Sequence, residues 1–341
     1  MIHIEYLHGD LAAEYLKREG PGLLGVLGFP VVPAGCAQAV PHASVAAAGP
    51  RTGPRPADLC EVWMSREPVR HGADGDIRFA VSGDFLFGVF AVSQGAAAGA
   101  LRGSAERAYA GIFAMLGRHG FPHAVRFWNY FPRINEPEGG VERYRLFNMG
   151  RGAAFDSAGR DREGTIPAAC ALGTDSGDAL TVYFVAAREA GLAVENPRQV
   201  SAYRYPPEHG PHSPTFSRAV LYPAKDPAML FVSGTASIVG HRTVHAGDVV
   251  AQTRETLANL EAVFAEAGRR SRPGAFSMRE ASYKVYIRRA ADARAVRNEL
   301  AAALGEEADV NFLRADICRA ELLVEIEAIA YAGDAGERPR R

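Results

Sequence analysis

The sequence predicts an α+β protein in which related units of mixed β-sheet are packed by helices. Three observations support this fold class. The order strand, Ser-Gly, strand, helix, strand occurs in both halves of the chain, a long amphipathic helix is expected over 247–268, and an apolar strand is expected over 322–330. The 341 residues are enough for two or three domains.

The first half shows its pattern most clearly after residue 76. Residues 1–75 are rich in Gly, Pro and Ala and suggest short strands and loops. Residues 77–92 predict two strands broken at a Ser-Gly pair, and 103–120 has apolar positions at helical spacing and ends in Gly. An aromatic strand is expected at 124–131, and 144–155 also resembles a strand.

The second half repeats this order. Residues 229–240 match 79–88, which places Gly234 opposite Gly83. The helix over 247–268 is followed by a predicted strand at 282–288, and a helix at 294–305 and the strand at 322–330 are expected after it. Internal duplication explains the shared order, and the alternative is a coincidence of a common α+β pattern.

Between the halves, a strand at 181–187 leads into a Pro-rich segment over 196–215 with many Tyr, Arg and His residues. Its prolines restrict the backbone, so we expect a rigid loop that either binds an acidic ligand or braces the two halves. Tyr203 is one candidate donor. The domain limits that follow are 1–165, 166–215, 216–333 and a disordered tail at 334–341.

Composition and motifs exclude several classes of function. The net charge of −1 gives no positive electrostatic field that would attract nucleic acid. The four cysteines lie far apart and the ten histidines show no ligand spacing, so no metal site is expected. No apolar run is long enough for a membrane span, and reduced thiols fit a cytoplasmic protein. Motifs for phosphate, nicotinamide or a serine nucleophile are missing, so no cofactor is expected.

The stretch from Asn311 to Tyr331 contains the strongest candidates for catalytic residues. Glu325 and Glu327 share one face of a predicted strand with Leu323 and Ile329, and Cys318 stands seven residues before Glu325. A carboxylate in such a strand is costly unless it is paired or used. The alternative is an edge strand with both glutamates in solvent and Cys318 as a small core residue.

Four segments of the second half resemble the Rid/YjgF imine-deaminase family. They are FSRAV (216–220), MLFVSG (229–234), the helix at 247–268 and VEIEAIA (324–330). This resemblance implies chorismate-mutase-like units of mixed sheet and helices, in a trimeric or pseudo-trimeric arrangement with ligand sites at the clefts between units.

The whole chain resembles the chorismatases more closely still. The segments that carry this resemblance are FPRIN (131–135), YRLFNMGRGAAF (144–155), NPRQVSAYRYP (196–206), GPHSPTFSRA (210–219), SGTAS (233–237) and ADICRAELLVEIEA (315–328). These enzymes act on chorismate without a cofactor and join a degenerate Rid-like half to a functional one.

The resemblance implies roles for particular residues. Glu325 matches the catalytic Glu, and Cys318 and Gly234 match residues found in members that release 3-hydroxybenzoate. Carboxylate or hydroxyl contacts are expected from Tyr203, Arg218 and Arg288. Arg314, close to Cys318 in sequence, is a further candidate cation for the dianionic substrate.

The reaction that the resemblance implies begins when Glu325 protonates the enolpyruvyl ether. Attack by the ring hydroxyl then leads to 3-hydroxybenzoate and pyruvate, with 4-hydroxybenzoate as a possible co-product. Attack by water instead gives a dihydroxycyclohexadiene carboxylate. The sequence is also compatible with a Rid-type imine or enamine deaminase and with a metabolite-binding module of the same fold. We expect a monomer or a small homo-oligomer.

Overall fold

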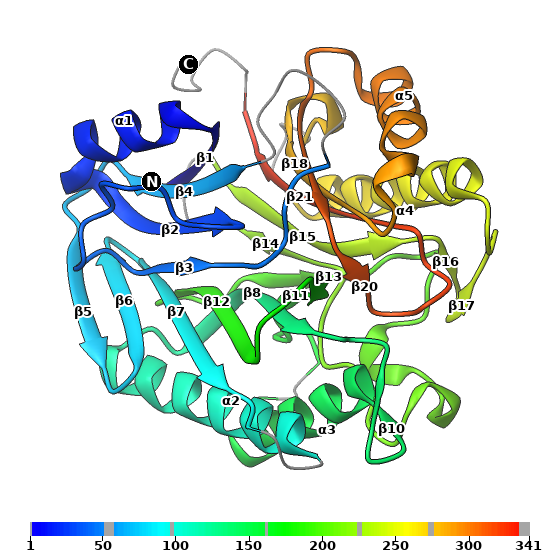
Figure 1. The fold of residues 1–341 in the computed structure, drawn as a ribbon, viewed down its shortest axis with the longest axis horizontal. Coiled ribbons are helices and arrows are strands. Elements are labelled where there is room, and N and C mark those ends of the chain that lie inside the picture. The colour runs from blue at the N-terminus through cyan, green and yellow to red at the C-terminus, as the bar shows by residue number, and fades with distance from the viewer. Residues whose placement is uncertain are drawn as a thin grey trace.

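The structure is a computed structural model and describes residues 2–50, 58–95, 99–160, 163–223, 227–271 and 276–333. Three β-sheets surround one central hydrophobic core, and helices cover the outer faces of the sheets (Figure 1). Trp63, Trp128 and Tyr286, one from each sheet, all belong to this core. The chain therefore has the pseudo-trimeric arrangement expected from the sequence.

The first sheet comes from the N-terminal residues, for which the sequence predicted only short strands and loops. Its strands are in the order β1-β4-β2-β3. Helix α1 packs Ala12 and Leu16 against Val26 and Val62 of this sheet. The bounds are β1 Ile2–His8, α1 Asp10–Arg18, β2 Leu23–Phe29, β3 His42–Ser44 and β4 Leu59–Ser65.

The second sheet has the order β20-β11-β8-β12-β7-β6-β5. Helices α2 and α3 cover its outer face, where Tyr109 packs on both Phe127 and Phe155. The predicted break in 77–92 and the helix ending at Gly120 are confirmed. The bounds are β5 Arg70–Asp74, β6 Ile77–Ser82, β7 Phe85–Ser93, α2 Ala100–His119, β8 His123–Pro132, α3 Arg143–Ser157, β11 Ala168–Thr174 and β12 Ala179–Ala187.

The third sheet has the order β13-β14-β15-β21-β18-β19, and α4 and α5 cover its outer face. The long helix predicted at 247–268 is confirmed as α4, whose N-terminus is capped by Asp248. The bounds are β13 Leu192–Val194, β14 Ala219–Tyr222, β15 Met229–Ala236, α4 Val249–Arg270, β18 Ser282–Ile287, α5 Ala293–Leu304, β19 Asp309–Arg314 and β21 Val324–Tyr331. Between β19 and β21 in the chain, β20 Asp316–Ile317 pairs with β11 of the second sheet.

The second and third sheets share one topology. The run β6-β7-β12-β8-β11 corresponds to β14-β15-β21-β18-β19, and each pair of neighbours has the same parallel or antiparallel sense in both runs. This agreement supports the duplication. The match of Gly234 to Gly83 is wrong, because Gly83 lies in the β6–β7 turn at φ 56° whereas Gly234 lies inside β15, where the pairing register shifts.

The strand predicted at 144–155 is also wrong, since these residues form most of α3. The buried Phe147, Gly150 and Ala154 recur at intervals of three and four residues, which is a helical period. Gly150 faces the backbone of α2, where a Cβ would lie 2.9 Å from the carbonyl carbon of Arg102. This glycine therefore permits the close approach of the two helices.

Residues 166–215 do not only connect the two halves of the chain, because they include β11 and β12, which complete the second sheet. The Pro-rich segment that follows contains two short 3₁₀ turns, η2 Ala202–Arg204 and η3 Pro207–His209. The division into domains at 165 and 215 stays a prediction, and the predicted tail at 334–341 lies outside the described residues. Among the described residues, no helix has the length and apolar character needed to cross a membrane.

Candidate active site

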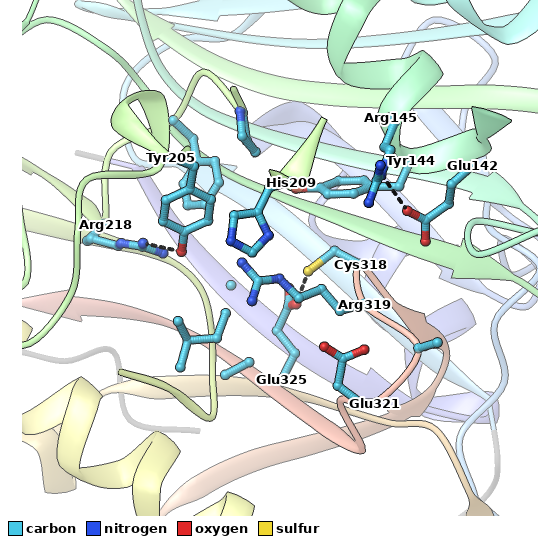
Figure 2. Close-up of a pocket in the computed structure, with 16 residues that line it drawn as sticks. Glu142, Tyr144, Arg145, Tyr205, His209, Arg218, Cys318, Arg319, Glu321 and Glu325 are labelled. Carbon is cyan, nitrogen blue, oxygen red and sulfur yellow. Dashed lines mark hydrogen bonds and ion pairs between the residues drawn. The ribbon is translucent and has the colours of Figure 1, made fainter. Parts of the chain in front are cut away.

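A cavity of about 280 Å³ opens next to the centre of the third sheet (Figure 2). Its walls come from α3, the Pro-rich segment, β15, the connection between β20 and β21, and β21 itself. Glu325, Cys318, Gly234 and Arg218 all line it. Four of the seven residues predicted from the sequence are thus brought together, although they are spread over more than 100 positions of the chain.

Glu325 lies on β21, which is hydrogen-bonded on both sides by β15 and β18, and it is only 3% exposed. Its carboxyl group lies against Gly234. A Cβ at position 234 would lie 2.7 Å from the Glu325 carboxyl carbon and 3.0 Å from Cβ of Cys170. The glycine is therefore required by the space that the Glu325 side chain occupies.

Cys318 is half-buried, and its Sγ lies 4.0 Å from Oε2 of Glu325. The turn between β20 and β21 brings the two side chains close to each other, although they are seven positions apart in the sequence. Burial, with a smaller effect of Glu325, raises the pKa of the Cys318 thiol to about 12. The group is therefore a neutral thiol at physiological pH, which argues against a role as a thiolate nucleophile.

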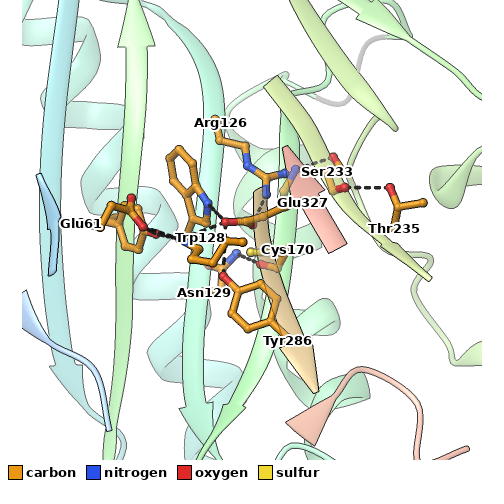
Figure 3. A network of polar contacts seen from close by, with 12 residues as sticks. Glu61, Arg126, Trp128, Asn129, Cys170, Ser233, Thr235, Tyr286 and Glu327 are labelled. Atoms are coloured by element: carbon orange, nitrogen blue, oxygen red, sulfur yellow. Dashed lines mark hydrogen bonds and ion pairs between the residues drawn. The ribbon is translucent and has the colours of Figure 1, made fainter. Parts of the chain in front are cut away.

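Glu327, two residues further along β21, is also buried but is fully paired (Figure 3). Arg126 Nη2 lies 2.6 Å from its Oε2, and Lys284 Nζ lies 2.9 Å from its Oε1. Trp128 Nε1 donates a third bond to Oε1 at 2.9 Å. Burial alone would raise the pKa of Glu327, but Lys284 and Arg126 outweigh it and hold this pKa below the usual range.

The network continues to the first sheet through Glu61. Lys284 forms an ion pair with Glu61 as well as with Glu327, and Trp63 Nε1 donates to Glu61 Oε1 at 2.7 Å. Both charged partners, Glu61 and Lys284, are completely buried. Burial opposes the charge of Lys284, but the two carboxylates outweigh it and raise its pKa. This network links all three sheets at the centre of the molecule.

Among the described residues, no cation lies within hydrogen-bond distance of Glu325. Burial and the neighbouring Glu327 carboxylate raise the pKa of Glu325 to about 8, and the more distant Arg126 and Arg288 only partly oppose this. The carboxyl group is therefore mostly protonated near neutral pH. It is a proton donor placed on the wall of a cavity.

Arg218 supplies a buried cation to the same cavity. Its Nη2 donates to Val200 O and to Tyr205 Oη, both at 2.8 Å. Its Nε is buried and has no partner among the described residues, so this donor is available to an anionic ligand. Arg145 and Arg319 also line the cavity and add positive charge to its wall.

Three predicted site residues are not among those that line the cavity. Arg288 donates to Leu322 O at 2.8 Å and pairs with Asp316 at 2.6 Å, so it holds the segment that carries Cys318. Arg314 is exposed on β19 and pairs with Asp175 at 2.7 Å.

The third of these residues, Tyr203, lies in η2, and Tyr205 lines the cavity in its place. The sequence could not separate these two tyrosines, because both lie in one polar segment. Arg319 and Tyr144 were also missed. Arg319 adjoins Cys318, which was a usable signal, whereas Tyr144 was assigned to a strand rather than to the start of α3.

The comparisons with known proteins point to one family. Residues 61–186 match the family model described as "Chorismatase FkbO/Hyg5-like, N-terminal". A chorismatase of Streptomyces rapamycinicus is 40% identical over 278 residues, which cover 80% of this chain and 82% of the relative. A 3-hydroxybenzoate synthase of Streptomyces hygroscopicus is 36% identical over 282 residues, with 80% and 81% covered.

A solved structure supports the same assignment across nearly the whole chain. A crystal structure of a chorismatase matches with a TM-score of 0.85 at 33% identity, and the match covers 97% of this chain and 98% of the other. The match extends over the N-terminal sheet, which the resemblance in sequence did not cover. This protein belongs to the chorismatase family.

Proposed function

We propose that this protein converts chorismate to 3-hydroxybenzoate and pyruvate without a cofactor, with Glu325 as the general acid. The observation that carries the proposal is the buried carboxyl group of Glu325, whose pKa is raised to about 8, on the wall of a cavity with cationic residues. The curated relatives named chorismatase and 3-hydroxybenzoate synthase support the choice of substrate and product.

Chorismate carries two carboxylates, so its site needs cationic donors around a small cleft. Arg218 offers a buried Nε without a partner among the described residues. Arg145 and Arg319 line the same cavity and are the candidates for the second carboxylate. Arg218 is already held by Val200 and Tyr205, so little side-chain freedom is lost when the substrate binds.

In the first step, Glu325 transfers its proton to the terminal methylene carbon of the enol ether. This creates an oxocarbenium ion and leaves a carboxylate at Glu325. Raising the pKa of an acid toward the working pH keeps it protonated and still able to donate, which is the condition for efficient general acid catalysis. Glu327 contributes to that condition through its fixed negative charge.

In the second step, the neighbouring ring hydroxyl attacks the ring carbon that bears the ether oxygen. The bond from this carbon to the ether oxygen breaks, its electron pair forms the ketone of pyruvate, and the hydroxyl proton returns to Glu325. The resulting arene-oxide-like intermediate opens and becomes aromatic as 3-hydroxybenzoate. Chorismate equals the two products atom for atom, so no water is consumed.

We assign the choice between this path and attack by water to the wall formed by Cys318 and Gly234. Burial keeps the Cys318 thiol neutral, so it shapes the pocket and orients the ring rather than attacking it. Gly234 leaves room on this wall for the Glu325 carboxyl group.

The test is incubation of the purified protein with chorismate, with pyruvate and aromatic products resolved by chromatography. Pyruvate and 3-hydroxybenzoate in equal amounts are expected. Glu325→Gln should lose about 10²–10⁴-fold in kcat, because the amide cannot donate the proton. The control is Glu321→Gln, which changes an exposed carboxylate at the rim of the same cavity and should retain most of the activity.

A second variant tests the choice of path. Cys318→Ala should move part of the product from 3-hydroxybenzoate to the dihydroxycyclohexadiene carboxylate, whereas Cys36→Ala, far from the cavity in sequence and not lining it, should not. An unchanged product ratio would make Cys318 a packing residue. Failure to release pyruvate from chorismate would overturn the proposed function as a whole.

A monomer is the assembly that we expect. One chain already supplies three sheets around a closed core, which is what three separate chains supply in a trimer of such units. Light scattering of the purified protein tests this directly.

A further inference from the structure

A cluster of three polar side chains stands at the rim of the cavity and has no part in the proposed reaction. We call Glu208, His209 and His241 the rim cluster. Glu208 and His209 belong to η3, and His241 lies in the tight turn between β16 Ile238–Val239 and β17 Arg242–Thr243. The two histidines are 32 positions apart in the sequence, so their spacing gave no sign of a metal site.

The three donor atoms of the rim cluster lie within 3.6 Å of one another. His209 Nε2 and His241 Nδ1 are 3.0 Å apart, and Oε1 of Glu208 lies 3.3 Å from the His241 nitrogen and 3.6 Å from the His209 nitrogen. Ligands that bind Zn²⁺ tetrahedrally at 2.0–2.2 Å are separated by about 3.3 Å. The three atoms therefore already have the spacing of one face of a zinc tetrahedron.

The backbone holds these side chains in place. His209 N donates to Pro206 O at 3.1 Å, and two successive prolines restrict the segment that enters η3. On the other side, Gly240 turns the hairpin at φ 60° and donates its N–H to Arg198 O at 2.9 Å. An ion that binds both segments would cost little conformational entropy, because each segment is already held by its own backbone hydrogen bonds.

The chemistry of the donors selects the ion. Two imidazole nitrogens and one carboxylate oxygen suit zinc and its neighbours among the divalent transition ions, and do not suit Mg²⁺ or Ca²⁺, which prefer oxygen ligands. The histidine side chains are 22% and 24% exposed and Glu208 is 61% exposed, so solvent can supply the fourth ligand. Arg145 and Arg319, which line the adjoining cavity, oppose a further positive charge, so moderate affinity is expected.

We propose that Glu208, His209 and His241 form a binding site for a zinc-type divalent transition ion at the rim of the cavity. A bound ion ties η3 to the β16–β17 hairpin. Both segments carry residues of the cavity wall, His209 and Ile238 respectively. The site shares His209 with the cavity wall but uses none of the residues assigned to the proposed reaction, and it does not depend on the identity of the substrate.

The test is a titration of the full chain with Co²⁺, followed by visible absorption, and then displacement of Co²⁺ by Zn²⁺. One ion per chain is expected, with the intense visible bands of a tetrahedral Co²⁺ site. His209→Ala and His241→Ala should each weaken binding at least tenfold and abolish these bands, because two protein ligands remain. Glu208→Gln should weaken binding less, since an amide oxygen is a poorer ligand.

His212→Ala is the matched control. His212 lies in the same Pro-rich segment and also faces a carboxylate, with its Nε2 3.4 Å from Asp156 Oδ2, but it has no second histidine. This variant should bind Co²⁺ like the wild type. Circular dichroism of each variant checks that the fold is kept. The proposal is overturned if the wild type gives no tetrahedral Co²⁺ spectrum, or if His209→Ala and His241→Ala both bind Co²⁺ like the wild type.

Discussion

The central strands of the second and third sheets, β12 and β21, occupy corresponding places but carry different chemistry. On β12, Thr181 pairs with Tyr130 and Tyr183 with Trp128 of the next strand. On β21, Glu325 pairs with Tyr286 in the same way, and Glu327 pairs with Lys284. At these two positions, one sheet has uncharged residues and the other has carboxylates.

The difference shows how one of two similar sheets can gain ionisable side chains while its strand order stays the same. In the second sheet, Tyr183 stacks on Trp128 at 4.5 Å between ring centres, so the pair adds to the aromatic core. In the third sheet, Lys284 stands where Trp128 stands and holds Glu327 charged. That fixed charge lies next to Glu325, which has no cation within hydrogen-bond distance among the described residues and is mostly protonated near neutral pH. The tyrosine and tryptophan of one pair of strands stabilise the core, whereas β21 carries a buried carboxyl group with a raised pKa.

The largest effect is expected from removing the cation that the third sheet has in place of Trp128. Lys284→Met leaves Glu61 and Glu327 buried with no lysine between them. The free energy of unfolding should fall by about 3–5 kcal/mol, because breaking a buried ion pair leaves an uncompensated charge. Urea denaturation measures this. Lys17→Met, on the exposed side of α1, should change stability little.

The next effect tests how closely β15 approaches Glu325. Gly234→Ala places a methyl group against the Glu325 carboxyl group, which must move. We expect kcat to fall by about 10- to 100-fold, since small displacements of a reacting group are costly. In the control, Gly111→Ala, the new Cβ meets only Ile77 Cδ1 at 3.9 Å and kcat should not change. A fully active Gly234→Ala would contradict the tight fit between β15 and β21.

The influence of Glu327 on its neighbour appears in the pH dependence of the reaction. In the proposed reaction Glu325 acts in its protonated form, so log(kcat/KM) should decline as the pH rises above its pKa of about 8. Glu327→Gln removes the negative charge that raises this pKa, and the decline should begin about one pH unit lower.

The position of this decline does not depend on how much of the variant is folded. Glu321→Gln, which changes an exposed carboxylate on the same cavity, should leave the decline where it is. An unshifted profile in Glu327→Gln would show that burial alone sets the pKa of Glu325.

The dependence of stability on pH tests the raised pKa of Glu325 separately from catalysis. The pKa of Glu325 rises from 4.5 to about 8 on folding, so its stabilising contribution is complete below pH 4.5 and is lost as the pH rises toward 8. In this window the group lowers the free energy of unfolding by up to ~1.4 kcal/mol per pH unit. Glu325→Gln should remove that slope, whereas Glu321→Gln should retain it. Equal slopes for wild type and Glu325→Gln in chemical denaturation would contradict the raised pKa.

Several elements could be predicted from the sequence because their signals are local. The period of α4 and the alternation along β21 lie within single segments, and both were confirmed. The resemblance carried by 315–328 located Glu325 and Cys318, and the structure places them together on the cavity wall. The 144–155 segment was mistaken for a strand because its aromatic residues favour strands, while its packing against α2 favours a helix.

The remaining features depend on residues far apart in the chain. In the sequence, Glu325 and Glu327 look alike, as two carboxylates with apolar neighbours on one strand face. They differ because Arg126, from the second sheet, and Lys284, from the neighbouring strand β18, contact Glu327 and not Glu325. Ionisation of a buried carboxyl group depends on the charges around it, and those charges are brought there by the packing of three sheets. Strand periodicity thus identifies the two carboxyl groups, and the tertiary structure decides which of them is protonated near neutral pH.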